Sequence, residues 1–287
     1  MESQSNEPRK VTPAQAKKWL AENRGNRTIS EKIVLTYAID MEAGKWQLTG
    51  DPIRIAKDGT LLDGQHRLEA CVLSGKPFWT YVMEGCDPKV KWVIDTGLKR
   101  QMKDVLKMQG EVNSTLLAAT LNWLIRYDEN GTRIQRGITH NESLSYLSEN
   151  PTVRDSVQFA SAIRSRLKLV TATIVGGTHC VVARGDRHLA DNFWKSLATG
   201  VDLQPRDPIF IYRRWLERNY YGDRKASSTV NSAVAIKAIN AWLEGKEMQS
   251  LGWRPAGGEE FPRLIVPDGV VSDEVTGEDG EETATAA

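Results

Sequence analysis

The chain has 287 residues, of which 40% are hydrophobic and 26% are charged, so it can bury the core of one large domain or of two ordinary ones. No apolar run approaches the length of a membrane span, and the N-terminal "MESQSNEPRK" lacks the apolar centre of a signal peptide. The three cysteines are odd in number and lack metal-ligand spacing. We therefore expect a protein of a reducing cytoplasm.

The net charge of +1 conceals an uneven distribution of charge. Seven acidic residues and no basic residue lie between positions 268 and 287, which leaves 38 basic against 30 acidic residues, or +8, on the rest of the chain. A basic body with an acidic tail favours an anionic partner, and DNA is the candidate. The alternative is a tail that only increases solubility.

The first hundred residues predict alternating helices and strands after a disordered segment at 1–10. "TPAQAKKWLAEN" predicts a helix with Thr12 as its N-cap, and "SEKIVLTYAIDMEAG" predicts a second helix that Ser30 caps and Gly44 ends. "DPIRIA", "GTLLD" and "PFWTYVMEG" read as strands. Between the last two, "DGQHRLEACVLSG" predicts a helix that closes at Gly75.

Helical patterns dominate after about residue 95. Asn113 is expected to cap one helix, and Thr139 with Glu142 forms a capping box before another. Further helices are predicted in "TVRDSVQFASAIRSRL", "ADNFWKSLATG", "PIFIYRRWLERNYYG" and "SSTVNSAVAIKAINAWLEG". The predicted fold class is therefore α+β, with a small α/β domain at 11–95, an all-helical region at 96–267 and a disordered acidic tail at 268–287.

The stretch "LLDGQHRLEA" carries more polar chemistry than a strand-to-helix connection needs. A glycine at a helix N-terminus lets the backbone approach an anion, and Arg67 adds donors that suit phosphate. His66 is a candidate for phosphate binding or proton transfer. Asp63 would repel a bare phosphate, but a Mg²⁺ ion bridging carboxylate and phosphate oxygens would remove that conflict. The pattern favours a metal–nucleotide complex.

Each of these residues also has a purely structural interpretation. Asp63 is a good helix N-cap. Arg67 could pair with Glu69 or Glu31 on the surface, which would contribute little to stability. His66 could be a half-buried histidine whose hydrogen bonds are satisfied. It is their combination at one glycine turn that favours phosphate binding.

The segment from Asn26 to about residue 83 resembles the ParB/sulfiredoxin-like superfamily, in its "DGQHR" variant. The shared pattern is an arginine-bearing segment, a helix, a "PI-x-I" strand, a second strand and a G-x-x-R helix start. The resemblance implies that Gly64, Gln65, His66 and Arg67 hold nucleotide phosphates. Later segments, among them "DPIFIYRRWLERN", are similar to a protein family common in bacteriophages, which implies a phage or prophage origin and no particular activity.

Departures from the superfamily narrow the activities that the resemblance implies. Gln65 stands where sulfiredoxins carry a reactive cysteine, and Gln65-His66 replaces the G-E-R-R pattern of partition proteins. Free serine kinases of this fold place a catalytic glutamate near Asn26-Arg27, whereas the nearest acid here is Glu31. A second catalytic carboxylate would have to be Glu31, Asp40 or Glu69, which are the nearby candidates in the sequence.

Two further clusters have both a structural and a functional interpretation. Arg100 and Asp104, four residues apart, are expected to pair on a helix. "PRDPIFIYRRWLERNYYGDRK" mixes arginines with aromatic residues, as surfaces that bind nucleic-acid strands do. An amphipathic helix with its aromatic residues inward is the alternative. The candidate nucleic-acid contacts are Arg213, Arg214, Arg218, Arg224 and Lys225.

Two functions follow as hypotheses. The first is a Mg²⁺-dependent phosphohydrolase or kinase that uses ATP or CTP, with Asp63 as metal ligand and Asp63, His66 and Glu31 as catalytic residues. The second is a non-catalytic DNA-binding regulator whose nucleotide site is a switch or a relic. Either would act in the cytoplasm (the host cytoplasm if phage-encoded), and the sequence predicts no oligomeric state.

Overall fold

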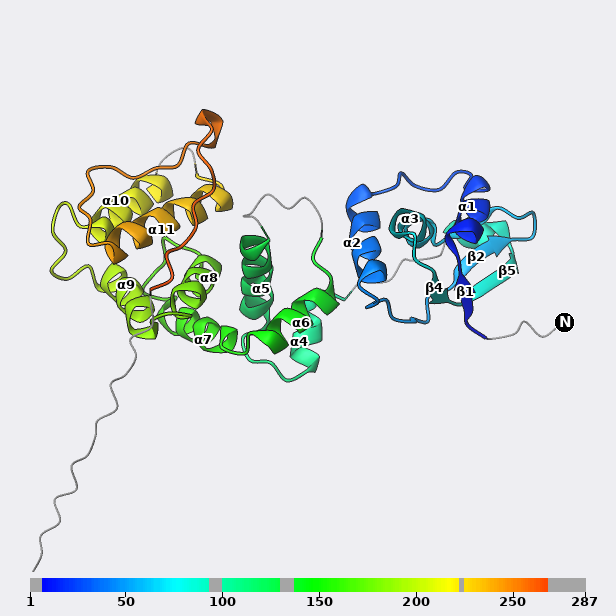
Figure 1. Cartoon of the computed structure of the whole chain (residues 1–287), viewed down its shortest axis with the longest axis horizontal. Helices are drawn as coiled ribbons and strands as arrows, with labels where there is room; N and C mark the ends of the chain where they lie inside the picture. Colours follow the sequence, from blue (N-terminus) through cyan, green and yellow to red (C-terminus); the bar gives the residue numbers. More distant parts are fainter. Residues whose placement is uncertain (1–6, 93–99, 130–136, 222–224, 268–287) are drawn as a thin grey trace, which may run out of the picture. The chain divides into compact units, whose positions relative to one another are not determined.

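Strands and helices alternate at the start of the chain, and helices alone follow. The computed structural model describes residues 7–92, 100–129, 137–221 and 225–267. It divides the chain into two units, Met1–Ala162 and Ile163–Ala287 (Figure 1). The α+β class is confirmed. The domain boundary expected near residue 95 and the acidic tail from residue 268 lie outside the described residues.

Two small sheets form the first part of unit 1. The strands are β1 (Arg9–Val11), β2 (Ile53–Ala56), β3 (Leu61–Asp63), β4 (Phe78–Thr80) and β5 (Val82–Cys86). The central strand β2 runs antiparallel to β3 and parallel to β5, while β1 and β4 form an antiparallel pair. Arg9 and Lys10 thus belong to a strand, which corrects the disorder expected for them, while residues 1–6 lie outside the described residues. The backbone of β4 gives them hydrogen-bond partners that the local sequence does not reveal.

Three helices complete this α/β part. They are α1 (Pro13–Ala21), α2 (Glu31–Glu42) and α3 (Gln65–Ser74). The backbone N–H of Gln15 donates to the Thr12 side chain over 3.2 Å, which confirms the predicted cap of α1. Ser30 is the N-cap residue of α2, but its side chain makes no capping hydrogen bond. The helix α3 packs against α1 and α2 (Figure 1), and its residues Leu68, Ala70 and Cys71 are fully buried.

The rest of unit 1 is helical, and one of its expected contacts does not form. Its helices are α4 (Met102–Met108), α5 (Ser114–Asp128), α6 (His140–Glu149) and α7 (Val153–Ile163), after the short 3₁₀ helix η1 (Pro88–Trp92). The Thr139–Glu142 capping box is confirmed. Asp104 accepts from the backbone N–H of Gln101 at 3.0 Å and so caps α4 instead of pairing with Arg100. Because α4 begins at residue 102, Arg100 is not on the helix.

Unit 2 is built of helices packed around aromatic side chains. They are α8 (Ala172–Val182), α9 (Arg187–Thr199), α10 (Pro208–Tyr221) and α11 (Ser228–Leu243), followed by the 3₁₀ helix η2 (Pro255–Gly257). Phe193, Trp194 and Tyr212 lie at their centre, with ring centroids 5.2–6.4 Å apart. The helix α8 has no amphipathic pattern because every residue from Ile174 to Val182 is buried. No helix in the described parts of the chain has the length and apolar character needed to cross a membrane.

Candidate functional site at the start of helix α3

A left-handed glycine begins α3. Gly64 is the N-cap residue, with φ of +102°, and no side chain caps the helix. A Cβ atom at this position would overlap the Cδ1 atom of Ile53. The glycine is therefore required both by its backbone conformation and by the packing of β2 against the turn. It leaves the positive end of the helix without a capping side chain.

Asp63 does not cap the helix but joins two arginines. Its Oδ1 atom accepts from the backbone N–H of Gly64 at 2.7 Å, and its Oδ2 atom lies 2.7 Å from Nη1 of Arg54. Nη2 of Arg67 is 3.7 Å from the same Oδ2 atom. Two guanidinium groups therefore share one carboxylate beside the helix end.

Arg54 belongs to this cluster although no motif indicates it. The register of the β2–β3 pair places Arg54 directly opposite Asp63. The alternation in "DPIRIA" puts Arg54 between two core residues, Ile53 and Ile55. The sequence could have indicated Arg54 through this alternation combined with the tight hairpin to "LLD". Residues that face each other across an antiparallel pair of strands interact.

Arg67 is turned toward the backbone that precedes β2. Its Nη2 atom donates to the Pro52 carbonyl at 2.9 Å, and Nη1 donates to the Asp51 carbonyl. Its side chain is only 12% exposed. Burial lowers the pKa of this guanidinium, an effect opposed by the nearby carboxylates of Asp63 and Asp51. Arg67 is therefore a positioning residue for the turn as well as a positive charge, and neither Glu69 nor Glu31 is its partner.

Gln65 and His66 hold the segment between α1 and α2 against the start of α3. Nε2 of Gln65 donates to the Arg27 carbonyl, and Oε1 of Gln65 accepts from Nδ2 of Asn23, each over 3.0 Å. Nε2 of His66 accepts from the backbone N–H of Ser30, also at 3.0 Å. Both side chains are buried. Gln65 and His66, two of the four residues that the resemblance assigns to phosphate binding, thus make structural contacts here.

Two of the candidate acids, Glu31 and Asp40, lie on α2. Glu31 is exposed in its first turn. Asp40 is buried near its end, where its Oδ1 atom accepts from the Thr139 hydroxyl at 3.0 Å. Asp40 therefore links α2 to the start of α6.

The residues around Asp63 do not fit a Mg²⁺ ion held by the protein. Both carboxylate oxygens of Asp63 already accept hydrogen bonds, and the two guanidinium groups beside them would repel a second cation. Over the described ranges, no three or more His, Cys, Asp or Glu side chains gather as metal ligands would. We therefore derive no metal-dependent step at this turn.

The candidate nucleic-acid residues are divided by the structure. Arg213 is drawn inward, with Nη1 donating to the Leu197 carbonyl at 3.2 Å and Nε lying 3.5 Å from Glu217. Arg214 and Arg218 are exposed on α10, and Lys225 is exposed beyond it. Arg224 lies outside the described residues.

The aromatic residues of this stretch are divided as well. Tyr212 and Trp215 are buried, as the amphipathic interpretation predicts. Tyr220 and Tyr221, at the end of α10, are 50% and 79% exposed. Nζ of Lys225 lies 5.9 Å from the centroid of the Tyr220 ring. A cationic and aromatic surface therefore remains at the end of α10. The buried rings of Tyr212 and Trp215 do not belong to it.

Comparisons with protein-family models, with curated protein sequences and with solved structures find no match to this chain. A functional proposal therefore depends on the geometry at the start of α3 and on the exposed surface of α10.

Proposed function

We propose that the α/β part of unit 1 binds the phosphate groups of a nucleoside triphosphate, ATP or CTP, at the start of α3. The observation that carries this proposal is the pairing of Arg54 and Arg67 with one carboxylate, Asp63, beside a glycine-initiated helix end that no side chain caps. Two guanidinium groups on one side of the turn and a helix N-terminus both favour a bound anion. The resemblance of residues 26–83 to nucleotide-binding ParB/sulfiredoxin-like proteins points the same way.

The site is proposed to bind a nucleotide without hydrolysing it. A general base needs a free lone pair within reach of the proton that it removes. Nε2 of His66 is already an acceptor for Ser30, and Asp63 is held by Gly64 and Arg54. This favours a nucleotide-controlled binding protein over the phosphohydrolase or kinase hypothesis.

Calorimetry on the full chain tests the proposal with ATP and with CTP, each with Mg²⁺ and with EDTA. Because two guanidinium groups lie beside Asp63 and no metal-ligand cluster gathers among the described residues, affinity for the free nucleotide should equal or exceed affinity for its Mg²⁺ complex. Arg54→Gln should weaken binding roughly 10–150-fold, the range for loss of a charge-assisted hydrogen bond. Arg9→Gln is the matched control, since Arg9 pairs with Glu84 on the exposed side of β1.

Two outcomes would overturn the nucleotide proposal. One is that the wild-type chain binds neither ATP nor CTP. The other is that Arg54→Gln and Arg9→Gln bind equally well. A requirement for Mg²⁺ in the wild-type chain would instead restore Asp63 as a metal ligand.

DNA binding by unit 2 is a second proposal, favoured by exposed side chains in the second half of α10. Arg214, Arg218 and Tyr221 are spaced four and three residues apart, so they share one face of the helix. Phosphate contacts from arginine release counterions, so affinity should fall steeply with salt. Replacing Arg214 and Arg218 together by Gln should reduce the salt slope by about two units in fluorescence anisotropy. An unchanged slope would contradict this second proposal.

A further inference from the structure

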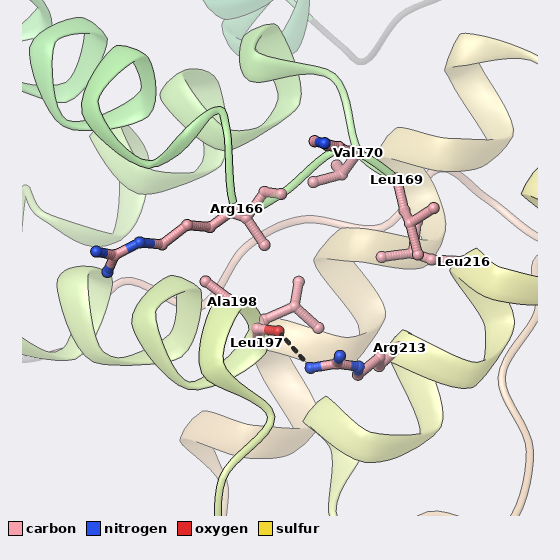
Figure 2. A pocket seen from close by; sticks show the side chains of 9 residues that line it. Arg166, Leu169, Val170, Leu197, Ala198, Arg213 and Leu216 are labelled. Atoms are coloured by element: carbon pink, nitrogen blue, oxygen red, sulfur yellow. Dashed lines mark hydrogen bonds between the residues drawn. The ribbon is translucent and has the colours of Figure 1, made fainter.

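A small cavity opens in unit 2 where α9 and α10 meet the segment before α8. Its volume is about 50 Å³. The buried side chains of Leu167, Val170, Leu197 and Leu216 make its apolar wall. Figure 2 shows the last three of them. A cavity needs about 10–15 Å³ of volume on this scale to hold one water molecule, so this cavity has room for one short aliphatic side chain.

Positive charges surround this apolar wall. Arg166 and Lys168 are exposed lining residues, and neither forms an ion pair within the described part of the chain. Figure 2 shows the Arg166 side chain reaching away from the apolar residues. Arg213 also lines the cavity, but its charge is partly offset by Glu217 at 3.5 Å, and Nη1 donates to the Leu197 carbonyl. The cavity therefore has an apolar wall, and at its edge lie two cationic side chains, Arg166 and Lys168, that form no ion pair within the described part of the chain.

The described chain ends in the same unit. A Cβ atom at Gly185 would overlap the carbonyl oxygen of Pro267, so the last described residue packs against the connection between α8 and α9. The residues Leu197 and Ala198 of the cavity wall are near the opposite end of α9. A helix of 13 residues is about 20 Å long, which sets the distance that the following segment must cover.

The segment 268–287 contains a residue pattern that complements the cavity. It holds seven acidic residues and no basic residue, and within it Asp273 and Glu274 directly precede Val275. An extended chain covers about 3.3 Å per residue, so the eight residues from Pro267 to Val275 reach about 26 Å. Val270, three residues from Pro267, reaches only about 10 Å. Val275 is thus an aliphatic residue far enough from Pro267 to reach the other end of α9. Two acidic residues directly precede it.

We propose that the acidic segment of this chain binds back onto unit 2, with Val275 in the apolar cavity and Asp273 and Glu274 against Arg166 and Lys168. The occupant is a short acidic peptide with one aliphatic anchor, supplied by the chain itself. A partner carrying the same acid–acid–aliphatic pattern would compete for the cavity.

The test follows the backbone amide resonances of residues 270–278 in the full chain by NMR. In the wild type at low salt, these resonances should be broadened by attachment to the folded unit, and high salt should sharpen them because it screens the ion pairs. Val275→Asp is the decisive variant. It removes the aliphatic anchor and adds a negative charge, so the cavity proposal predicts loss of the broadening, whereas a purely electrostatic contact predicts that the broadening increases.

Two controls separate the cavity from general charge attraction. Val270→Asp makes the same substitution at a position too near Pro267 to reach the cavity, and it should leave the broadening as in the wild type. Arg166→Glu combined with Lys168→Glu should abolish the broadening, whereas Arg218→Glu, outside the cavity, should not. Both substituted cavity residues are exposed, so the fold should tolerate the change.

The proposal is overturned if the wild-type resonances are sharp at low salt, or if Val275→Asp and Val270→Asp behave alike. It is also overturned if reversing Arg218 releases the segment as fully as reversing Arg166 and Lys168, because the contact would then be diffuse. These readouts do not involve a nucleotide, so the result is independent of the proposal for α3.

Discussion

The Nε2 atom of His66, on α3, accepts a hydrogen bond from the backbone N–H of Ser30 at the start of α2, over 3.0 Å. A side chain from one helix therefore satisfies a donor at the N-terminus of another, where the first N–H groups have no partner within their own helix. The imidazole contributes this contact only when its Nε2 atom carries no proton. The contact between α3 and the start of α2 thus depends on an Nε2 atom without a proton.

His66→Ala should destabilise the fold. It leaves the part-buried N–H of Ser30 without this acceptor, at a cost of about 1–3 kcal/mol in the free energy of unfolding. His140→Ala is the control because His140 is exposed on α6, and it should change that free energy by less than about 0.5 kcal/mol. Urea unfolding of the full chain measures both. Equal effects would show that the hydrogen bond to Ser30 contributes nothing.

Asp63→Asn distinguishes an Asp63 that balances the charges of Arg54 and Arg67 from an Asp63 that binds a metal ion. The neutral amide cannot balance Arg54 and Arg67, so the free energy of unfolding should fall by roughly 1.5–3 kcal/mol. The site also becomes more positive, so nucleotide phosphates should bind more tightly in EDTA. A metal ligand would behave in the opposite way, because its loss weakens binding. Calorimetry with and without Mg²⁺ decides between them.

Gly64→Ala should be more damaging than the same change at Gly59. Both glycines have positive φ, +102° and +84°. Adding a Cβ in this left-handed conformation should lower the free energy of unfolding by about 1–2 kcal/mol at either position. Only at Gly64 would that Cβ overlap Ile53, whereas nothing lies within 4 Å at Gly59. Thermal unfolding should therefore show a clearly larger loss for Gly64→Ala. Equal losses would mean that Ile53 moves aside without cost.

Tyr212→Phe should stabilise unit 2. The Tyr212 hydroxyl is fully buried and has no hydrogen-bond partner among the described residues, and such a group costs about 1–3 kcal/mol. Tyr146→Phe is a useful contrast, because the Tyr146 hydroxyl donates to Asp128 over 2.6 Å and its removal should cost about 1 kcal/mol. If Tyr212→Phe lowers the free energy of unfolding, the hydroxyl has an acceptor in solution.

Acid should destabilise unit 2 through His179. Burial lowers the pKa of this imidazole below its usual 6.5, although Nε2 lies 2.9 Å from the Asp191 carboxylate. As the pH falls through 6.5, the unfolded chain therefore takes up a proton before the folded chain does, and stability declines by at most about 1.4 kcal/mol per pH unit.

A second group in the same cluster extends the loss to lower pH. Burial by itself would raise the pKa of Asp191, but hydrogen bonds from His179, Lys195 and Arg187 lower it overall. The stability that this carboxylate contributes is present above its ordinary pKa and is lost as the pH falls further.

The free energy of unfolding, measured with urea, should therefore fall less between pH 7.5 and pH 5.5 in His179→Gln than in the wild type. His188→Gln, at an exposed site on α9, is the control and should keep the wild-type decline. A decline in His179→Gln equal to that of the wild type would assign the acid sensitivity to other groups.

Local signals in the sequence were sufficient to predict most helices and their ends. The caps at Thr12 and at Thr139 with Glu142 act within four residues, so they can be read from neighbouring positions. The same holds for Gly64 and Gly75, which bound α3 with positive φ. The helix α8 was missed because burial on every side removes the periodic pattern that identifies a surface helix.

The partners of the polar residues at the turn were decided only by the tertiary structure. The sequence alone placed Asp63, His66 and Arg67 at one helix start. It could not show that Arg54 faces Asp63, or that His66 reaches Ser30, 36 positions earlier in the chain. Strand register and helix packing bring such residues together, and both depend on the whole buried core. A local motif therefore determines which groups are available, and long-range packing determines which of them remain free to bind.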